Sequence, residues 1–146
     1  MYKWYTVNTG KLCPAGWHVP SDADWNTLTN YLINNGYGFQ GSGDDIAKSM
    51  AAKTDWTSWE YTGAVGNNLA ANNKSGFTGL PISCRFWNGE FEKIGSHGYW
   101  WSSTYTTEFS NNFGHIWGLS YLSGILSKNT LPPLGNGCSV RCIKDN

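Results

Sequence analysis

The sequence predicts a single α+β domain spanning residues 1–146, and three observations carry that prediction. One helical pattern with both ends marked covers residues 22–34. From residue 77 onward, short segments rich in aromatic and β-branched residues alternate with Gly and Asn, which predicts small antiparallel sheets. Between these parts, residues 56–76 carry many Asn and Gly without a sustained period, which predicts a long irregular region.

The helix predicted at Asp22–Asn34 rests on local signals. Ser21 stands at the N-cap position and Asp24 at the third helical position, a capping-box pattern with Asp in place of the usual Glu. Apolar residues at 25, 28, 32 and 33 form one face of the helix. The Asn-Asn-Gly sequence that follows supplies residues that tolerate the left-handed conformation at a helix end.

The remaining elements are predicted from propensity and turn chemistry. In chain order, we expect a strand at residues 2–7, a second helix at 44–50 capped by Ser42 or Asp44, two β segments at 77–82 and 84–93 with an Asn88–Gly89 hairpin turn, a core strand at 98–105, two strands between 113 and 126 joined near 121–124, a break at Pro132–Pro133 and a last strand at 138–144.

Composition excludes several classes of function. Charged residues make up only 14% of the chain and the formal net charge is zero, so we expect no nucleic-acid partner. No apolar run approaches the length of a membrane span, so we expect no membrane insertion by this domain. An export signal or lipid anchor is expected to lie outside this chain.

The four cysteines allow three disulfide connectivities. We favour bridges from Cys13 to Cys142 and from Cys84 to Cys138, formed in an oxidising compartment. The alternative is a cytosolic protein with four reduced, buried cysteines. The spacings contain no Cys-x-x-Cys pair and the three histidines are scattered, so no metal site and no cofactor are expected.

Residues 105–136 form the most suggestive stretch for binding. Bulky residues fall mostly at odd positions there, with small or polar residues between them, which puts the bulky set on one face of a strand pair. This face is either part of the core or an exposed aromatic platform that binds a ligand. The candidate ligand contacts are Trp101, Tyr105, Phe113, His115, Trp117 and Tyr121, and Phe109 belongs to the same alternating set.

Four blocks in the chain resemble a known family, the Fibrobacter succinogenes major paralogous domain. They are Cys13-Pro-Ala-Gly-Trp-His-Val-Pro-Ser-Asp-Ala-Asp-Trp, Gly76-Phe-Thr-Gly-Leu-Pro, Tyr99-Trp-Trp-Ser-Ser-Thr and Ser139-Val-Arg-Cys-Ile-Lys-Asp. The resemblance implies a C-type lectin-like fold, related to that of the formylglycine-generating enzymes, with two helices packed on small antiparallel sheets and adjacent termini. It also implies an exported surface or lipid-anchored protein, located outside the cell or on its surface. Cys84 and Cys138 depart from the family pattern, which indicates an added bridge.

The resemblance to the lectin-like fold does not bring a calcium site or an activity with it. The calcium signatures of lectins are missing, because Trp87-Asn88 is followed by Gly89 rather than a carboxylate. Glu90 and Glu92 are two residues apart in a predicted strand and therefore lie on one face, as a glycosidase acid/base pair could, but their charged neighbours Arg85 and Lys93 favour a solvated hairpin. We therefore expect a protein that is not an enzyme.

The sequence thus predicts a monomeric, secreted or cell-surface binding module for a glycan or a surface protein. Trp17 and Trp25 are expected to fill the core, and His18 to be structural. Two alternatives stay open. One is a variable receptor-binding protein of a diversity-generating retroelement, with residues 105–136 as the variable part. The other is a structural or adhesive spacer domain of an envelope lipoprotein.

Overall fold

The computed structural model describes residues 1–92, 94–108, 111–131 and 135–145, so Phe109 and the predicted Pro132–Pro133 break lie outside the described residues. The fold is α+β, as predicted. Its helices are α1 (Trp4–Asn8), α2 (Asp22–Asn34) and α3 (Ala47–Met50), with single 3₁₀ turns at Phe39–Gly41 and Leu69–Ala71. Its strands are β1 (Tyr2–Lys3), β2 (Trp17–His18), β3 (His97–Glu108), β4 (Asn111–Ser120), β5 (Ser127–Leu131), β6 (Gly137–Cys138) and β7 (Ile143–Lys144).

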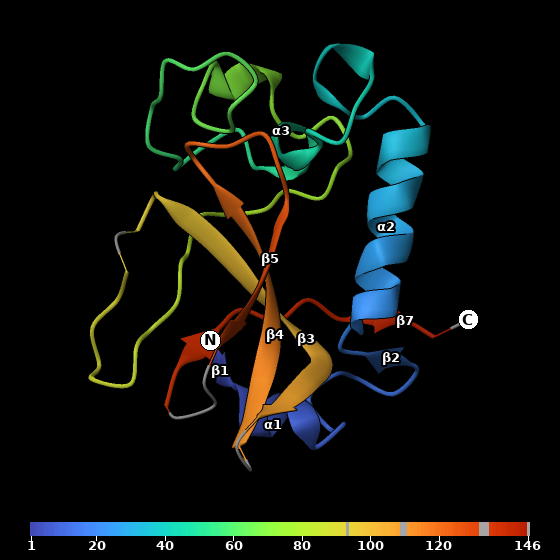
Figure 1. The fold of residues 1–146 in the computed structure, drawn as a ribbon, viewed down its shortest axis with the longest axis vertical. Coiled ribbons are helices and arrows are strands. Elements are labelled where there is room, and N and C mark those ends of the chain that lie inside the picture. The colour runs from blue at the N-terminus through green and yellow to red at the C-terminus, as the bar shows by residue number, and fades with distance from the viewer. Residues whose placement is uncertain (93, 109–110, 132–134, 146) are drawn as a thin grey trace.

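Figure 1 shows α2 alongside the sheet β3-β4-β5, with α1 and β1 at one end and the long irregular region at the other. The prediction for α2 is confirmed at both ends. The Ser21 hydroxyl accepts a hydrogen bond from the backbone N–H of Asp24, and Asp24 accepts one from the backbone N–H of Ser21 at 2.8 Å. This capping box satisfies two of the backbone donors that a helix start leaves open.

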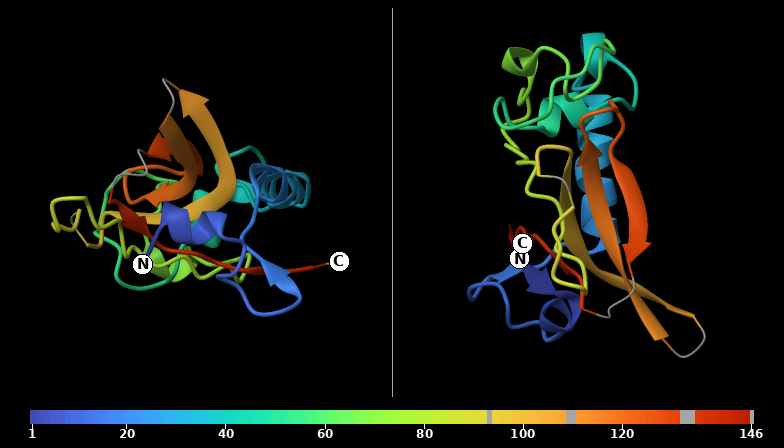
Figure 2. Two further views of the ribbon diagram at one scale, coloured as in Figure 1. Left: turned by 90° about the horizontal axis from the view of Figure 1, so that it is seen from below. Right: turned by 90° about the vertical axis from the view of Figure 1, so that its left-hand side faces the viewer.

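The antiparallel sheet β3-β4-β5 is the centre of the fold. Trp100 pairs with Trp117 and Trp101 pairs with Ile116, after which the register shifts before Tyr105. Such a bulge bends the strand and re-aims its side chains. Both views of Figure 2 show β3 and β4 running on together beyond the rest of the chain. The predicted strand pair is confirmed, but its second strand begins at residue 127, after the turn rather than within 113–126.

Two hydrophobic cores lie on opposite faces of this sheet. The first contains Trp25, Trp100 and Trp117 together with residues of α3 and of the irregular region. The second contains Trp101 and Ile116 together with the N-terminal segment and the second disulfide. Neighbouring strand residues therefore enter different cores, as expected from the alternation of side chains along a strand.

The N-terminal segment differs from its prediction. Only Tyr2–Lys3 is a strand, and residues 4–8 form the helix α1, which buries Trp4 and Val7 in the second core. Gly114 leaves no room for a Cβ beside the Trp4 ring, so glycine at this position permits the contact. Long-range packing thus overrides the β propensity of the segment.

Both ends of the chain pair with each other. β1 pairs with β6, and β2 pairs with β7, so the predicted last strand is two short strands in separate sheets. Both predicted disulfides are confirmed: Cys13–Cys142 joins positions 129 residues apart, and Cys84–Cys138 joins positions 54 residues apart. Trp17 is 44% exposed on β2, so its predicted place in the core is wrong, whereas Trp25 is buried as expected.

The irregular region is organised around Lys48 on α3. This helix is shorter than predicted and has no side-chain cap. The Lys48 ammonium is buried and donates to the Asn72 Oδ1 at 2.8 Å and to the carbonyls of Asn68, Asn67 and Ala64. Because no carboxylate is among these partners, the backbone dipoles of the region solvate the charge in place of water.

Candidate functional site

The six predicted ligand contacts do not form one exposed platform. Trp101, His115 and Trp117 are buried, Tyr105 is 46% exposed, and Phe113 and Tyr121 are half-buried. The expectation of an exposed aromatic face is therefore wrong for the three buried residues. The expectation fails because other parts of the chain cover both faces of β4. The alternation of bulky and small residues along this strand therefore does not mark a solvent-exposed face.

The predicted contacts that remain accessible are also separated. Tyr105 pairs with Gly114 near the start of β4 and packs edge-on against Trp4 at 5.2 Å between ring centroids. Tyr121 follows the end of β4 and packs edge-on against Trp59 at 5.8 Å. The part of β4 from Gly114 to Ser120 thus separates the two residues.

His115 and Trp117 belong to a buried polar cluster centred on Asp22. The Asp22 carboxylate lies 2.6 Å from His115 Nδ1, 3.0 Å from Trp117 Nε1 and 2.5 Å from Lys128 Nζ. Because an ionised carboxylate only accepts hydrogen bonds, Nδ1 of His115 carries a proton here. Thr104 accepts a bond from the Asp22 backbone N–H at 2.9 Å, so the cluster fixes the start of α2 on the sheet.

Hydrogen bonding outweighs burial at this carboxyl. Burial opposes its ionisation, but bonds from Lys128, Trp117, His115 and Ser102 lower the pKa of Asp22 to about 2. Thr106 extends the cluster, because its Oγ1 lies 2.7 Å from His115 Nε2. Thr106, His115 and Asp22 thus form a row of three side chains with His115 in the middle. We assign it a structural role, because each of its polar groups faces another protein group and both indole and imidazole are buried.

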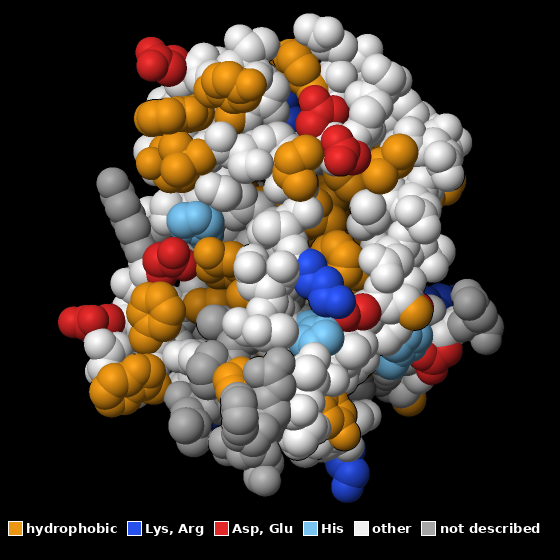
Figure 3. Space-filling view, viewed as in Figure 1, with side chains coloured by type: hydrophobic (Ala, Val, Ile, Leu, Met, Phe, Trp, Pro, Cys, Tyr) orange, Lys and Arg blue, Asp and Glu red, His pale blue; other side chains and the backbone are white. Residues whose placement is uncertain are grey.

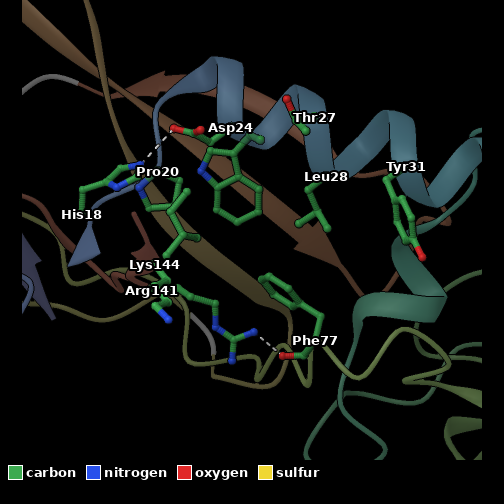
Figure 4. Close-up of a pocket in the computed structure, with 11 residues that line it drawn as sticks. His18, Pro20, Asp24, Thr27, Leu28, Tyr31, Phe77, Arg141 and Lys144 are labelled. Carbon is green, nitrogen blue, oxygen red and sulfur yellow. Dashed lines mark hydrogen bonds and ion pairs between the residues drawn. The ribbon is translucent and has the colours of Figure 1, made fainter. Parts of the chain in front are cut away.

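A cavity of about 420 Å³ lies beneath α2, between that helix, the loop at Phe77 and the C-terminal segment (Figure 4). Its volume is within the range of small-molecule sites. Most of its wall is apolar, and Figure 4 shows the charged side chains on the side away from Leu28 and Tyr31. The lining residues of this α2 pocket are His18, Pro20, Asp24, Trp25, Thr27, Leu28, Tyr31, Phe77, Arg141, Ile143 and Lys144.

Arg141 is the distinctive group of the α2 pocket. Its guanidinium carbon lies 4.1 Å from the centroid of the Phe77 ring, and its Nη1 donates to the Phe77 carbonyl (Figure 4). Burial lowers the pKa of Arg141 from its usual value. Within the part of the chain that the structure describes, no carboxylate forms an ion pair with Arg141, so no described acidic group neutralises its charge at the pocket wall.

His18 is placed differently, between two carboxylates at the rim. Its Nδ1 lies 2.6 Å from Asp145 Oδ1, and its Nε2 lies 3.5 Å from Asp24 Oδ2. The hydrogen bond to Asp145 is the main cause that raises the pKa of His18, and the contacts with Asp24 add to it. Both ring nitrogens of His18 thus face carboxylates of the protein, which leaves Arg141 and Lys144 as the lining cations without a carboxylate partner among the described residues.

Chain order explains how the C-terminal segment reaches the α2 pocket. Arg141 and Ile143 line the pocket, whereas Cys142 between them is bonded to Cys13. The disulfide therefore holds this segment beneath α2. Sequence reasoning missed Arg141 as a site residue because its partner Phe77 is 64 positions away.

Within the described residues, no group of three or more His, Cys, Asp or Glu side chains is placed to hold a metal ion. No described helix is long and apolar enough to cross a membrane.

Comparisons with known proteins identify a family for the chain but no activity. Searches of curated proteins and of solved structures found no match. The sequence model of the Fibrobacter succinogenes major domain matches residues 1–144, which is nearly the whole chain. The four sequence blocks that resemble this family lie within or at the end of the matched range, and the chain belongs to the Fibrobacter succinogenes major domain family.

Proposed function

We propose that this chain is a non-enzymatic binding domain of an exported or cell-surface protein, and that its ligand enters the α2 pocket. The ligand carries a carboxylate beside a short apolar group. One observation supports this most: Arg141, which has no carboxylate partner among the described residues, brings its guanidinium to the wall of a mostly apolar cavity and packs it on the Phe77 ring.

The pocket chemistry matches both parts of such a ligand. Trp25, Leu28 and Ile143 offer apolar surface, and burying apolar groups against it contributes about 25 cal/mol per Å². Arg141 offers a planar set of donors that suits a carboxylate, and Phe77 holds that plane in place. A guanidinium that has already lost part of its hydration has less water to give up when the anion arrives.

This chemistry favours a protein ligand over a neutral glycan at the α2 pocket. A carboxylate beside an apolar side chain occurs at acidic positions and at the C-terminus of polypeptides. A uronic acid offers the same carboxylate on a more polar ring. The test therefore includes glucuronate as a separate arm.

The proposed location and finer fold have their own support. Two disulfides join distant parts of the chain, which is typical of proteins exported to oxidising compartments. Paired chain ends, one long helix and a long irregular region are consistent with a C-type lectin-like fold. We therefore retain that fold and an extracellular or cell-surface location as part of the proposal.

The test compares hexanoate with hexanol, which has the same chain without the charge. Calorimetric titration should show that hexanoate binds and that hexanol binds at least about tenfold more weakly, since hydrogen bonds to charged groups contribute about 1.5–3 kcal/mol. Arg141→Gln should remove this preference. Arg85→Gln is the matched control, because Arg85 is the only other arginine in the chain and does not line the α2 pocket.

Equal binding of hexanoate and hexanol would contradict the proposal, as would an equal loss in Arg85→Gln. Binding of glucuronate but not hexanoate would redirect it to acidic glycans. Melting temperatures of both variants should be measured first, so that a loss of binding is not a loss of folding.

A further inference from the structure

A second cavity, of about 380 Å³, lies where the hairpin at residues 84–92 meets the central sheet. Its apolar lining residues are Cys84, Phe86 and Ile116. Its polar groups come from three elements: Glu92 from the hairpin, Tyr99 from β3, and Asn129 and Thr130 from β5. We call this cavity the hairpin pocket. It shares no lining residue with the α2 pocket.

We propose that the hairpin pocket binds a neutral, hydroxyl-rich ligand of the size of a sugar ring. Binding at the hairpin pocket does not depend on the proposed function of the α2 pocket. Sugar hydroxyls act as donors and acceptors at once, so a site for them needs a fixed acceptor, groups of mixed character and an apolar surface. The hairpin pocket brings these together.

Glu92 is the fixed acceptor. Ser83 donates its hydroxyl proton to Glu92 Oε2 at 2.8 Å, and His97 Nδ1 lies 3.2 Å from Glu92 Oε1. Since each carboxylate oxygen accepts about two hydrogen bonds, capacity remains for a ligand. Glu90 on the same hairpin differs, because it is exposed and its carboxylate bonds only the side chain of its neighbour Asn88 among the described residues.

The orientation of Glu92 depends on a strained residue. Ser83 is fully buried and has a φ of 65°, in the left-handed region that residues other than Gly, Asn and Asp rarely adopt. Such strain persists only where the surrounding structure fixes it. Here it directs the Ser83 hydroxyl to a carboxylate at the wall of a cavity, an arrangement expected of a positioned binding group rather than a solvated one.

Tyr99 and the β5 side chains supply the groups of mixed character. The Tyr99 ring stacks on His97 at 5.4 Å with 5° between the planes, which fixes the phenol. Burial and the charge of Glu92 raise the pKa of Tyr99 to about 12, so its hydroxyl stays protonated at neutral pH. Asn129 and Thr130 are exposed on β5 and carry an amide and a hydroxyl.

Charge selects a neutral ligand over an anionic one. The residues that line the hairpin pocket include Glu92 but no Lys or Arg within the described chain, so an anion meets repulsion there. The α2 pocket has the opposite character, with Arg141 and Lys144 in its wall.

Exposed aromatic side chains on the same hairpin agree with a sugar ligand. Trp87 is 76% exposed and Phe91 is 53% exposed. In Figure 3, hydrophobic and acidic side chains lie close together on the side of the molecule where the hairpin runs. Aromatic rings with one face open to solvent are favoured anchors at binding sites.

The test titrates ¹⁵N-labelled protein with the methyl glycosides of glucose, galactose, mannose, xylose and N-acetylglucosamine. At least one should shift the Asn129 side-chain amide and the Tyr99 backbone amide, with a Kd on the order of 1–10 mM. Glu92→Gln keeps the size of the side chain and an acceptor for Ser83, and should weaken binding about tenfold. Glu90→Gln is the matched control and should leave binding unchanged.

Asn129→Ala provides a second variant at an exposed position, and should also weaken binding while the melting temperature holds. The proposal is overturned if no glycoside shifts these signals at concentrations tenfold above that Kd range, if Glu90→Gln weakens binding as much as Glu92→Gln, or if the shifts map to Leu28 and Ile143 instead. Arg141→Gln should leave glycoside binding unchanged, which separates this site from the α2 pocket.

Discussion

Replacing Asp22 by Asn should destabilise the fold in a pH-dependent way. The substitution keeps the side-chain shape and an acceptor for Trp117 Nε1, but it removes the charge that Lys128 faces. The new amide N–H group would point at one of the other donors, Lys128 or His115, in a buried cluster.

The magnitude follows from the pKa of the Asp22 carboxyl. A fall from 3.8 to about 2 corresponds to roughly 2 kcal/mol, since a difference of one in pKa is about 1.4 kcal/mol. In Asp22→Asn, the amide N–H group faces another donor inside the cluster, which adds about 1–2 kcal/mol to the loss of stability. We expect Asp22→Asn to lower the free energy of unfolding by about 2–4 kcal/mol at neutral pH.

The pH dependence has a defined sign. Because folding lowers the pKa of Asp22, its stabilisation is fully present above the unfolded pKa of about 4. It is lost as the pH falls from about 4 to about 2, where the folded carboxyl also takes up a proton. The gap between wild type and Asp22→Asn should therefore be constant from pH 7 to pH 5 and shrink strongly by about pH 2.

Urea unfolding followed by tryptophan fluorescence at several pH values measures this gap. Asp55→Asn is the control, because Asp55 is exposed and Asn tolerates its left-handed backbone at a φ of 70°. It should change stability by less than about 0.5 kcal/mol. Equal stability of Asp22→Asn and wild type at pH 7, or a gap that is the same at pH 7 and pH 2, would refute the electrostatic reasoning.

Three further substitutions test the fold. Trp117→Ala should lower the free energy of unfolding by about 3–5 kcal/mol, because it leaves a cavity against Trp25; an unchanged melting temperature would contradict a core role for Trp117. Lys48→Met should lower the free energy of unfolding by about 1–3 kcal/mol and speed proteolysis of the irregular region, because the carbonyls of that region lose the ammonium that donates to them; equal cleavage rates in wild type and variant would contradict this role of Lys48. Replacing Cys13 and Cys142 by Ser should cost about 5 kcal/mol in the chain-entropy estimate for 129 residues, measured by urea unfolding, and an equally stable variant would contradict it.

Local signals predicted the parts of the fold that local chemistry determines. Ser21 and Asp24 fix the start of α2 through bonds between near neighbours. Asn88–Gly89 lies in the turn that closes the 84–92 hairpin, where Gly89 has a φ of 91°. The cysteine pairing was also predicted correctly, although sequence alone left other connectivities open.

Long-range contacts account for what the sequence did not reveal. Residues 4–8 are helical because Trp4 and Val7 enter a core built by distant strands. Asp22 and His115 are 93 positions apart, so a residue predicted for ligand contact proved to be a buried partner of α2. Arg141 was missed for the same reason, since only the fold brings it over Phe77.

The most direct test of the central claim locates a ligand in the α2 pocket. In a methyl-labelled sample titrated with hexanoate, the Leu28 and Ile143 signals should shift and saturate in wild type and in Arg85→Gln, but not in Arg141→Gln. Saturable shifts confined to those methyl groups are the predicted result. Absence of saturable shifts there, or shifts of the same size in Arg141→Gln, would contradict the proposed role of the pocket.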